Sequence, residues 1–424
     1  MKVIVIGAGI SGLYAAYLLK LKGFEVTVLE ATKRYGGRIR SVQSAEGEPL
    51  ELGAEFIHGQ YSLLKEYVAQ KGIGTYRAKG KSFLYYKGVL KNEDKWLEKI
   101  PELKFVFDFF ENFWKYREHE LTVDNFIKKD VVLSKFRVLM DVFAVEYGTS
   151  NSRLGLRSLA ATEQMWSAGQ KDYKIQSQMI RVLDEFVQLL HGNIIYEKPI
   201  SEINYSESKV QAVSLDEKIY TADAVLVTVP VSVLKKKIIK FIPSLPAEKT
   251  AAFHRLGMGA GMKIVLKFRK QFWKKKMFEI WGSKLCPTYY SPFPRQEKTE
   301  NYLIGYVTGV KAEYLGSLGN KAVDLIVNEL DEIFGSNIAS TNLEESTLMD
   351  WGKEPYIWGM YSYDKPNSEG MREELAKPID DKVFFAGEAT NYNGHPATLH
   401  GAMETAERAV FELNEKRENR YFLT

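Results

Sequence analysis

A glycine-rich turn near the start of the chain has the spacing that a dinucleotide requires. An apolar run at residues 3–6 leads into Gly7, Gly9 and Gly12 in a Gly-x-Gly-x-x-Gly pattern, and a helical stretch follows. Such a turn lets the backbone approach a pyrophosphate, whose negative charge the N-terminus of the next helix favours. Glu30 ends the second expected strand, about 20 residues after the turn, where a carboxylate can accept ribose hydroxyls. The hexapeptide alone would fit an ordinary tight turn equally well, but the whole series predicts a dinucleotide site.

Residues 34–38, Arg-Tyr-Gly-Gly-Arg, extend this series. With its Gly37 and Arg38, the extension resembles that of flavoproteins of the glutathione-reductase type. The resemblance implies FAD as the cofactor in place of NAD, held by a Rossmann-like domain.

Composition limits the class of protein. The 424 residues, 45% of them hydrophobic, can bury a large core, and ~150 residues per domain indicates two or three domains. The single cysteine, Cys286, excludes disulfides within the chain and indicates a reducing compartment, so we expect a cytoplasmic location. A net charge of +4 is too small to imply nucleic acid. The apolar runs are strand-sized, which predicts no signal peptide and no membrane span.

Periodicity along the chain predicts an α/β fold with two interleaved domains. We expect residues 1–84, 185–245 and 375–424 to form a discontinuous, Rossmann-like FAD-binding domain. Residues 85–184 and 246–374 are expected to form an α+β substrate-binding domain. The expected helices lie at residues 105–116, 135–147, 178–191, 247–255, 321–334 and 399–417, and the expected strands at 194–196, 200–205, 210–215, 224–229, 262–268, 302–307 and 382–386. The first of these helices carries an aromatic stripe that fits core packing.

Five motifs, in order, resemble those of the flavin-containing amine oxidases, the family of monoamine oxidases, polyamine oxidases and histone lysine demethylases. The resemblance covers nearly the full length of the chain. Its motifs are the opening fingerprint, residues 52–59, the segment around Lys263, residues 351–361, and residues 387–390 leading into 396–402. One departure is Gln176-Ser177-Gln178, where many relatives carry a Gly-Gly pair. This departure affects the expected conformation of the local loop and does not affect the prediction of the cofactor.

The resemblance also assigns cofactor contacts. Glu388 alone would be an ordinary acid at a helix N-terminus, but with Gly387 it resembles the family's second clamp on the flavin. We expect its carboxylate to bind hydroxyls or to order nearby amides. Further cofactor contacts are implied for Gly53, Ala54, Glu55, Phe56, Ile200, Trp351, Tyr356 and Thr398.

Lys263 has two opposite interpretations. Alternation along residues 262–268 puts the apolar side chains on one face and Lys263 with Lys267 on the other, which normally meets solvent. The family keeps a lysine at this point, after a glycine-rich turn, where it holds a water against flavin N5. The resemblance therefore implies that Lys263 is catalytic.

Aromatic residues crowd the segment 351–363, and strand packing alone could explain them. By the resemblance, Tyr361 matches the first of two tyrosines that flank the flavin in monoamine oxidases. Thr398 stands where the second would be, as in polyamine oxidases and demethylases. Monoamine oxidases attach flavin to a cysteine before the first tyrosine. Here that residue is Met360, so we expect FAD to be non-covalent.

Residues at the mouth narrow the expected substrate. His58 resembles the animal-type polyamine oxidases, although a packed, hydrogen-bonded histidine is the alternative. L-Amino-acid oxidases carry an arginine where this chain has Phe56, which argues against substrates with an α-carboxylate. Glu55 is the only acid in the mouth motif, so the sequence identifies no carboxylates for distal ammonium groups. His395 and His400 have no third ligand nearby in the sequence, which predicts no metal site.

The resemblance implies oxidation of a small-molecule amine. Hydride passes from the amine α-carbon to flavin N5, water hydrolyses the imine to an aldehyde, and O2 reoxidises the flavin to give hydrogen peroxide. A polyamine or secondary amine is favoured over a compact arylalkylamine. The alternatives are a monoamine oxidase, a flavin desaturase or porphyrinogen-type oxidase, and a non-catalytic FAD-binding module. The sequence names neither the amine nor the oligomeric state.

Overall fold

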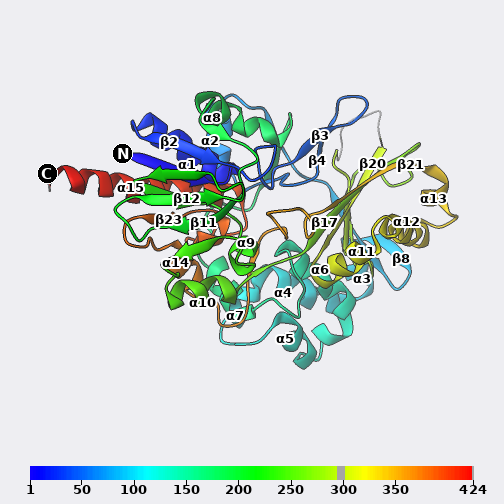
Figure 1. Cartoon of the computed structure of the whole chain (residues 1–424). Coiled ribbons are helices and arrows are strands. Elements are labelled where there is room, and N and C mark those ends of the chain that lie inside the picture. Colours follow the sequence, from blue (N-terminus) through cyan, green and yellow to red (C-terminus); the bar gives the residue numbers. More distant parts are fainter. Residues whose placement is uncertain (294–300, 423–424) are drawn as a thin grey trace.

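A parallel five-stranded sheet forms one end of the molecule (Figure 1). The structure, a computed structural model, describes residues 1–293 and 301–422. The strand order is β10-β2-β1-β14-β23, with β1 (Lys2–Ile6), β2 (Glu25–Leu29), β10 (Ile194–Ile195), β14 (Ala224–Val227) and β23 (Val383–Phe385). All five strands fall within the three segments expected for the FAD-binding domain. The exact division of the chain into domains stays a prediction.

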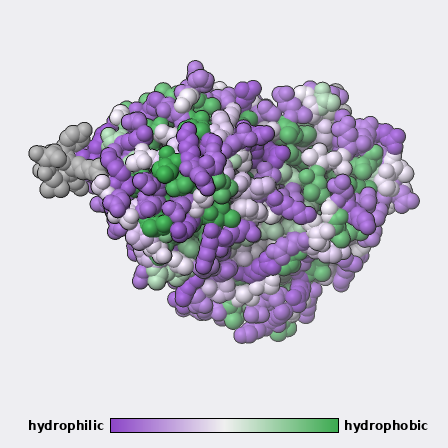
Figure 2. Space-filling view, viewed as in Figure 1, coloured by the Kyte–Doolittle hydropathy of each residue, from purple (hydrophilic) through white to green (hydrophobic). Residues whose placement is uncertain are grey.

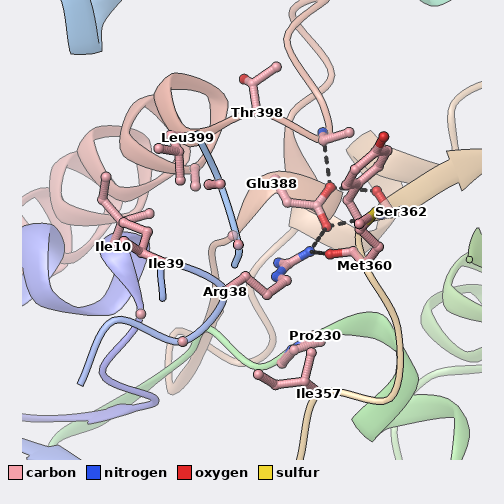
Figure 3. Close-up of a pocket in the computed structure, with 18 of the residues that line it drawn as sticks. Ile10, Arg38, Ile39, Pro230, Ile357, Met360, Ser362, Glu388, Thr398 and Leu399 are labelled. Atoms are coloured by element: carbon pink, nitrogen blue, oxygen red, sulfur yellow. Dashed lines mark hydrogen bonds and ion pairs between the residues drawn. The ribbon is translucent and has the colours of Figure 1, made fainter. Parts of the chain in front are cut away.

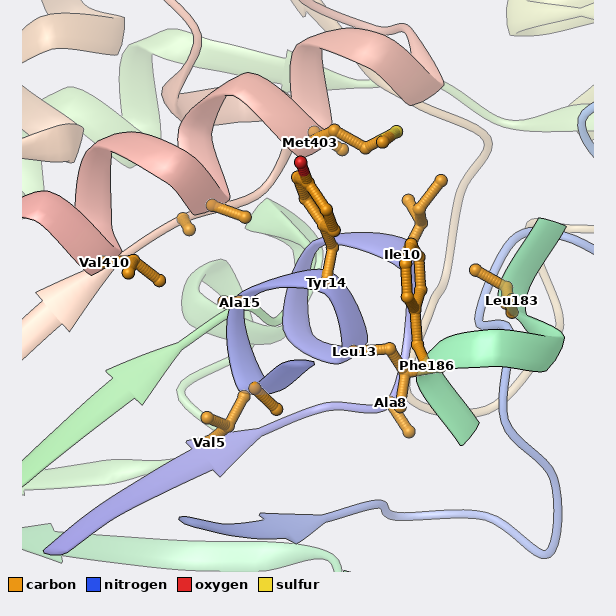
Figure 4. Packing of buried hydrophobic residues seen from close by; sticks show 14 of the residues in the cluster. Val5, Ala8, Ile10, Leu13, Tyr14, Ala15, Leu183, Phe186, Met403 and Val410 are labelled. Atoms are coloured by element: carbon orange, nitrogen blue, oxygen red, sulfur yellow. The ribbon is translucent and has the colours of Figure 1, made fainter. Parts of the chain in front are cut away.

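Two helices cover one face of this sheet because their apolar sides meet its β-branched residues. They are α1 (Ile10–Leu21), which follows β1, and α15 (Leu399–Phe422), near the end of the chain. Val5 of β1, Met403 and Val410 of α15 and Leu13 of α1 belong to one buried cluster, and Figure 4 shows Leu13 close to Ala8 and Phe186. The two ends of the chain therefore share one core, and the helix α8 (Asp184–Leu189) joins it.

A four-stranded sheet and a short helix lie beside the five-stranded sheet. The sheet order is β13-β12-β11-β15, with β11 (Ile200–Asn204), β12 (Val210–Ser214), β13 (Ile219–Ala222) and β15 (Lys240–Ile242), and the helix is α9 (Val231–Lys235). The strands expected at 200–205 and 210–215 are confirmed to within one residue. A bulge in β11 next to Ile200 shifts the register there.

A seven-stranded sheet forms the opposite end of the molecule (Figure 1). Its order is β21-β17-β20-β19-β18-β7-β8, with β7 (Lys81–Tyr86), β8 (Val89–Asn92), β17 (Gly261–Phe268), β18 (Met277–Trp281), β19 (Thr288–Tyr290), β20 (Asn301–Thr308) and β21 (Leu343–Asp350). Three helices accompany it: α11 (Gly309–Leu318), α12 (Lys321–Phe334) and α13 (Ile338–Asn342). Within this sheet, strand β17 has partner strands on both sides and is buried on both faces. Met262 and Leu266 pack with Ile326 of α12, whereas Val265 packs with Tyr290 and Trp351. The solvent-face interpretation of Lys263 is therefore wrong, because both faces of this strand are covered.

Helices α3 (Glu93–Lys99), α4 (Lys104–Asn112), α5 (Val123–Lys129), α6 (Arg137–Glu146) and α7 (Leu156–Glu163) form a third layer. The expected aromatic helix at 105–116 is α4 followed by a 3-10 turn (Phe113–Tyr116). Its Phe109 and Phe113 each lie 5.0 Å from the ring of Phe143. The interpretation as a core-facing stripe is thus confirmed.

Shorter elements connect these layers. The strands are β3 (Ser41–Gln43), β4 (Pro49–Glu51), β5 (Ile57–His58), β6 (Thr75–Arg77), β9 (Asp172–Ile175), β16 (Leu256–Met258) and β22 (Ser362–Asp364). The helices are α2 (Leu63–Gln70), α10 (Ala247–Arg255) and α14 (Met371–Ala376), with further 3-10 turns at Pro101–Leu103, Leu133–Phe136, Met179–Leu183 and Glu388–Thr390. The loop that departs from the relatives leaves β9 at Gln176, whose N–H donates to Gly74 O, and the next turn is anchored by Met179 N on Glu51 Oε1.

Hydrophilic residues cover most of the face in Figure 2, with hydrophobic residues in scattered groups. Within residues 1–293 and 301–422, no helix is both long enough and apolar enough to cross a membrane.

Candidate functional site

One large cavity of about 680 Å³ lies between the two ends of the molecule. Nearly every residue that the sequence assigned to the site lines it: Gly7, Gly9, Glu30, Gly37, Arg38, Gly53, Ala54, Glu55, Phe56, His58, Ile200, Lys263, Trp351, Tyr356, Tyr361, Gly387, Glu388 and Thr398. Gly12 does not line it and instead lies beneath the turn. The cavity thus opens at the carboxyl ends of β1 and β2, where α/β sheets bind ligands.

The dinucleotide end of the cavity is shaped by backbone. Gly7 adopts φ +105°, which side chains rarely tolerate, and a Cβ on Gly12 would lie 2.0 Å from Gly7 O. A Cβ on Gly9 would meet nothing within 4 Å, so this glycine faces open space in the cavity. Glu30 accepts hydrogen bonds from Ala8 N (2.8 Å) and Thr32 N (2.9 Å), which hold its carboxylate beside the turn. An open cradle of this kind next to an acid fits a dinucleotide.

Glu388 ties three separate segments together at the cavity wall (Figure 3). Its carboxylate accepts hydrogen bonds from Arg38 Nη1 (2.8 Å), from N and Oγ of Ser362 (3.1 and 2.6 Å), and from Ala397 N (3.0 Å). Burial raises the pKa of Glu388, but the guanidinium groups of Arg38 and Arg372 outweigh it and hold that pKa below its ordinary value. The structure therefore places Glu388 as an organiser of amides, one of the two roles expected for its carboxylate.

Lys263 belongs to a buried ionic cluster. Its side chain is 5% exposed, and Nζ donates to Glu55 Oε2 (2.6 Å) and to Glu51 O (2.9 Å). Lys174 of β9 donates to the other oxygen of Glu55 (2.5 Å), and Tyr290 OH donates to Oε2. Burial raises the pKa of Glu55, but the two ammonium groups outweigh it and lower that pKa to about 2. Glu55 is thus ionised, and the two ammonium groups more than balance its negative charge.

No sequence motif contains Lys174 or Tyr290, so neither residue was predicted to belong to the site. Both come from strands whose alternation says nothing about a charged partner more than 100 residues away.

Tyr361 and Thr398 both line the cavity at the end that is expected to receive the amine. Tyr361 OH lies 2.7 Å from Tyr306 OH and donates to Glu146 O at 2.9 Å. Thr398 Oγ1 donates to His395 O (2.8 Å) and accepts from Gly401 N (2.9 Å) at the start of α15. Both side chains are therefore held in place by the protein.

Carboxylates gather at this amine end, and the sequence did not reveal them. The cavity is lined there by Glu146, Glu163, Asp172 and Glu279. They come from α6, α7, β9 and β18 and therefore do not form a motif along the chain. Burial raises the pKa of Glu146 to about 7, with a further contribution from the charge of Glu279, and burial also raises the pKa of Glu163 to about 7.

His58 lies among these acids. Its Nδ1 is 3.0 Å from Asp172 Oδ1. Removal from water lowers the pKa of His58, but the hydrogen bond to Asp172 and the charges of Asp172 and Glu146 outweigh it, so the pKa is raised. His58 therefore lines the cavity and is also held by a hydrogen bond, so the structure agrees with both interpretations of this residue.

The expectation that His395 and His400 lack a third ligand is wrong, because Glu404 of α15 lies with them. The three potential ligand atoms are within 4.8 Å of one another. However, His395 Nδ1 already lies 2.9 Å from Glu404, and its Nε2 accepts from Ser167 N. Hydrogen bonds thus account for His395 and Glu404, and the absence of a metal site stays a prediction.

A sequence model of the family described as flavin containing amine oxidoreductase matches residues 10–414. The chain is 30% identical to "Probable polyamine oxidase 4" of Arabidopsis thaliana, an alignment that covers 97% of this chain and 88% of the relative. It is 29% identical to "Lysine-specific histone demethylase 2" of Homo sapiens, covering 97% of this chain and 53% of that protein.

Solved structures share the fold. Cyclohexylamine oxidase from Brevibacterium oxydans IH-35A superimposes with a TM-score of 0.83 at 19% identity, covering 98% of this chain and 99% of that one. Putrescine oxidase bound to putrescine superimposes with a TM-score of 0.81 at 16% identity, with the same coverage. Both the α/β architecture and the Rossmann-like domain expected from the sequence are confirmed.

Proposed function

The chain belongs to the family of flavin containing amine oxidoreductases, and we propose that it oxidises an extended, multiply charged amine without an α-carboxylate. As a member of this family it uses FAD. The proposal concerns the substrate, the chemical step and the residues that serve it.

The acids at the amine end support this substrate class. Glu146 is accessible from the cavity, and no described residue donates a hydrogen bond to its carboxylate. Glu279 accepts only one hydrogen bond from a described residue, from Ser82 Oγ (2.6 Å). Burial in the cavity wall disfavours the charged form of both carboxyl groups, and a substrate ammonium group would stabilise that form. This group of acids is the single observation that carries the proposal.

The cationic groups of the cavity argue against an amino acid as substrate. Phe56 stands at the mouth with aromatic neighbours, its ring 6.2 Å from that of Tyr290. Lys263 is bound to Glu55, and Arg38 is bound to Glu388. Arg372 Nε lies 3.0 Å from Asp364 Oδ1. Each of these cations has an acidic partner, which competes with a substrate carboxylate for it.

The proposed reaction gives each residue a separate task. Bound FAD would supply the hydride acceptor at N5, yielding an imine that water hydrolyses to an aldehyde, with O2 restoring the oxidised flavin and forming hydrogen peroxide. Gly7, Gly9, Glu30 and Arg38 would hold the dinucleotide. Tyr361 would steer the amine with its ring face. Lys263 would hold a water at the reacting edge and move protons there.

The test is an anaerobic screen of amines against the holoprotein, with bleaching of the flavin absorbance as the signal. We expect polyamines to bleach it and a following exposure to O2 to yield hydrogen peroxide. Turnover of an apolar polycycle without amine turnover would instead indicate a desaturase or porphyrinogen-type oxidase. Tightly bound FAD that no amine reduces would indicate a non-catalytic module.

A further inference from the structure

We propose that Lys174 is a positioning residue that binds one oxygen of Glu55 and thereby leaves the Lys174–Glu55–Lys263 cluster with a net positive charge and Lys263 with one free N–H at the cavity. The proposal rests on the proposed function in that it assigns Lys263 to the reacting edge of the flavin. It concerns a residue that does not itself line the cavity and that no motif contains.

The cluster has two ammonium groups and one carboxylate. The side chains of Lys174, Glu55 and Lys263 are 8%, 2% and 5% exposed. Lys174 and Lys263 each bind a different oxygen of Glu55, at 2.5 and 2.6 Å. Because the carboxylate is shared, the three groups together carry a single positive charge in a place that water hardly reaches.

Lys174 also decides how Glu55 is oriented. Its ammonium group is fixed by Pro292 O (2.6 Å) and lies 5.6 Å from the ring centre of Phe56. With Oε1 bound to this fixed group, Glu55 cannot turn both oxygens toward Lys263. A lysine has three N–H donors. Lys263 gives one to Glu55 and one to Glu51 O, which leaves the third for the cavity.

Both the net positive charge of the cluster and the free N–H of Lys263 affect the flavin. A flavin that takes up two electrons gains negative charge at neutral pH, and a buried positive charge nearby stabilises that form. Without Lys174, Glu55 and Lys263 would form a neutral pair, and Glu55 would be free to take a second N–H from Lys263. Loss of Lys174 therefore makes the flavin harder to reduce and disturbs Lys263, although Lys174 touches neither cofactor nor substrate.

The experiment measures the two-electron reduction potential of the bound flavin, by equilibration with a redox dye, in holoproteins carrying Lys174→Met, Lys174→Gln or Lys174→Arg. We expect the Met and Gln variants to lose about tenfold in the reduction equilibrium, which is about 30 mV for a two-electron couple. The Arg variant should keep the wild-type potential. The matched control is Lys171→Met, which removes an exposed positive charge three residues earlier in the chain.

Unchanged potentials in the Met and Gln variants would overturn the proposal, as would an equal shift in Lys171→Met. If Lys174→Met does not fold with FAD, the Gln variant gives the same comparison with a side chain that still donates hydrogen bonds. Because the dye reduces the flavin without any amine, this result is independent of the substrate. A wild-type flavin that no amine reduces would refute the proposed function and not the role of Lys174.

Discussion

The two ends of the cavity are built in different ways. At the dinucleotide end, the chain turns sharply at Gly7 and Gly12, and Glu30 receives the backbone amides of Ala8 and Thr32. At the amine end, side chains such as Glu146 and Glu279 come from separate elements. A backbone cradle serves any ligand with the same pyrophosphate, whereas side chains can be exchanged one at a time. Cofactor binding is therefore fixed by local geometry, and substrate choice is fixed by long-range packing.

The largest expected effect is at the dinucleotide end. In Gly12→Val the new Cβ would meet Gly7 O, 2.0 Å away, so the turn must open. A misfit of ~3 kcal/mol would weaken FAD binding by about 100-fold. The flavin-to-protein absorbance ratio after gel filtration measures this. Gly47→Ala is the control for backbone strain outside the cavity, because Gly47 has φ +87° although its Cβ would meet nothing within 4 Å. A normal flavin ratio in Gly12→Val would show that the cradle is not set by the backbone.

Lys263→Met tests the junction between the two ends. We expect FAD to stay bound while flavin reduction, reoxidation or both slow by about 100-fold, because a proton-transfer group and a positioned water are lost. Lys267→Met, four residues further along the same strand, is the matched control. Rapid mixing with amine and then with O2 separates the two half-reactions. Wild-type rates for both in Lys263→Met would remove this lysine from the mechanism.

The amine end should give smaller, substrate-dependent effects. Glu146→Gln removes a charge that we assign to a distal ammonium group, so KM for spermine should rise by about tenfold, with KM for benzylamine little changed. Glu111→Gln on the exposed side of α4 is the control. Equal effects on both amines would mean that Glu146 acts on the fold and not on the distal charge.

The pH dependence of KM for spermine provides a second test of the role of Glu146. Burial raises the pKa of Glu146 to about 7, so its carboxyl group ionises as pH rises through that value. Binding of a distal ammonium group should therefore strengthen from below to above this pKa in the wild type. Glu146→Gln should lack that component of the KM profile for spermine. Identical profiles in both proteins would contradict the assignment.

The last of these predictions needs no variant and concerns the link between protein and flavin. Met360 has no thiol that could form a thioether to the flavin, so we expect FAD to be non-covalent. Acid precipitation of the wild-type protein should release yellow flavin into the supernatant. Cys286, the only cysteine, is buried beside Thr288 and Tyr306 and does not line the cavity. Colour retained in the pellet would show a covalent link that the site residues do not explain.

The same contrast explains what the sequence could predict. Glycine spacing and Glu30 act within about 30 residues of chain, the size of a βαβ unit, so the cofactor end follows from local pattern. Lys263 shows the limit, because strand alternation put it in solvent while the second face of β17 packs in the interior. Lys174 meets Glu55 across 119 positions, and such pairings depend on the assembled sheets. The sequence therefore predicted the cofactor, and not the charges that surround the amine.

The most direct test of the account is the order of kcat/KM for spermine, N-acetylspermine, benzylamine and L-phenylalanine. An acid-lined cavity whose cations have acidic partners should favour spermine or its acetyl derivative, followed by benzylamine, with L-phenylalanine last. Benzylamine in first place would contradict the assignment of the acids to distal ammonium groups. L-Phenylalanine in first place would contradict the argument from Phe56 and the paired cations.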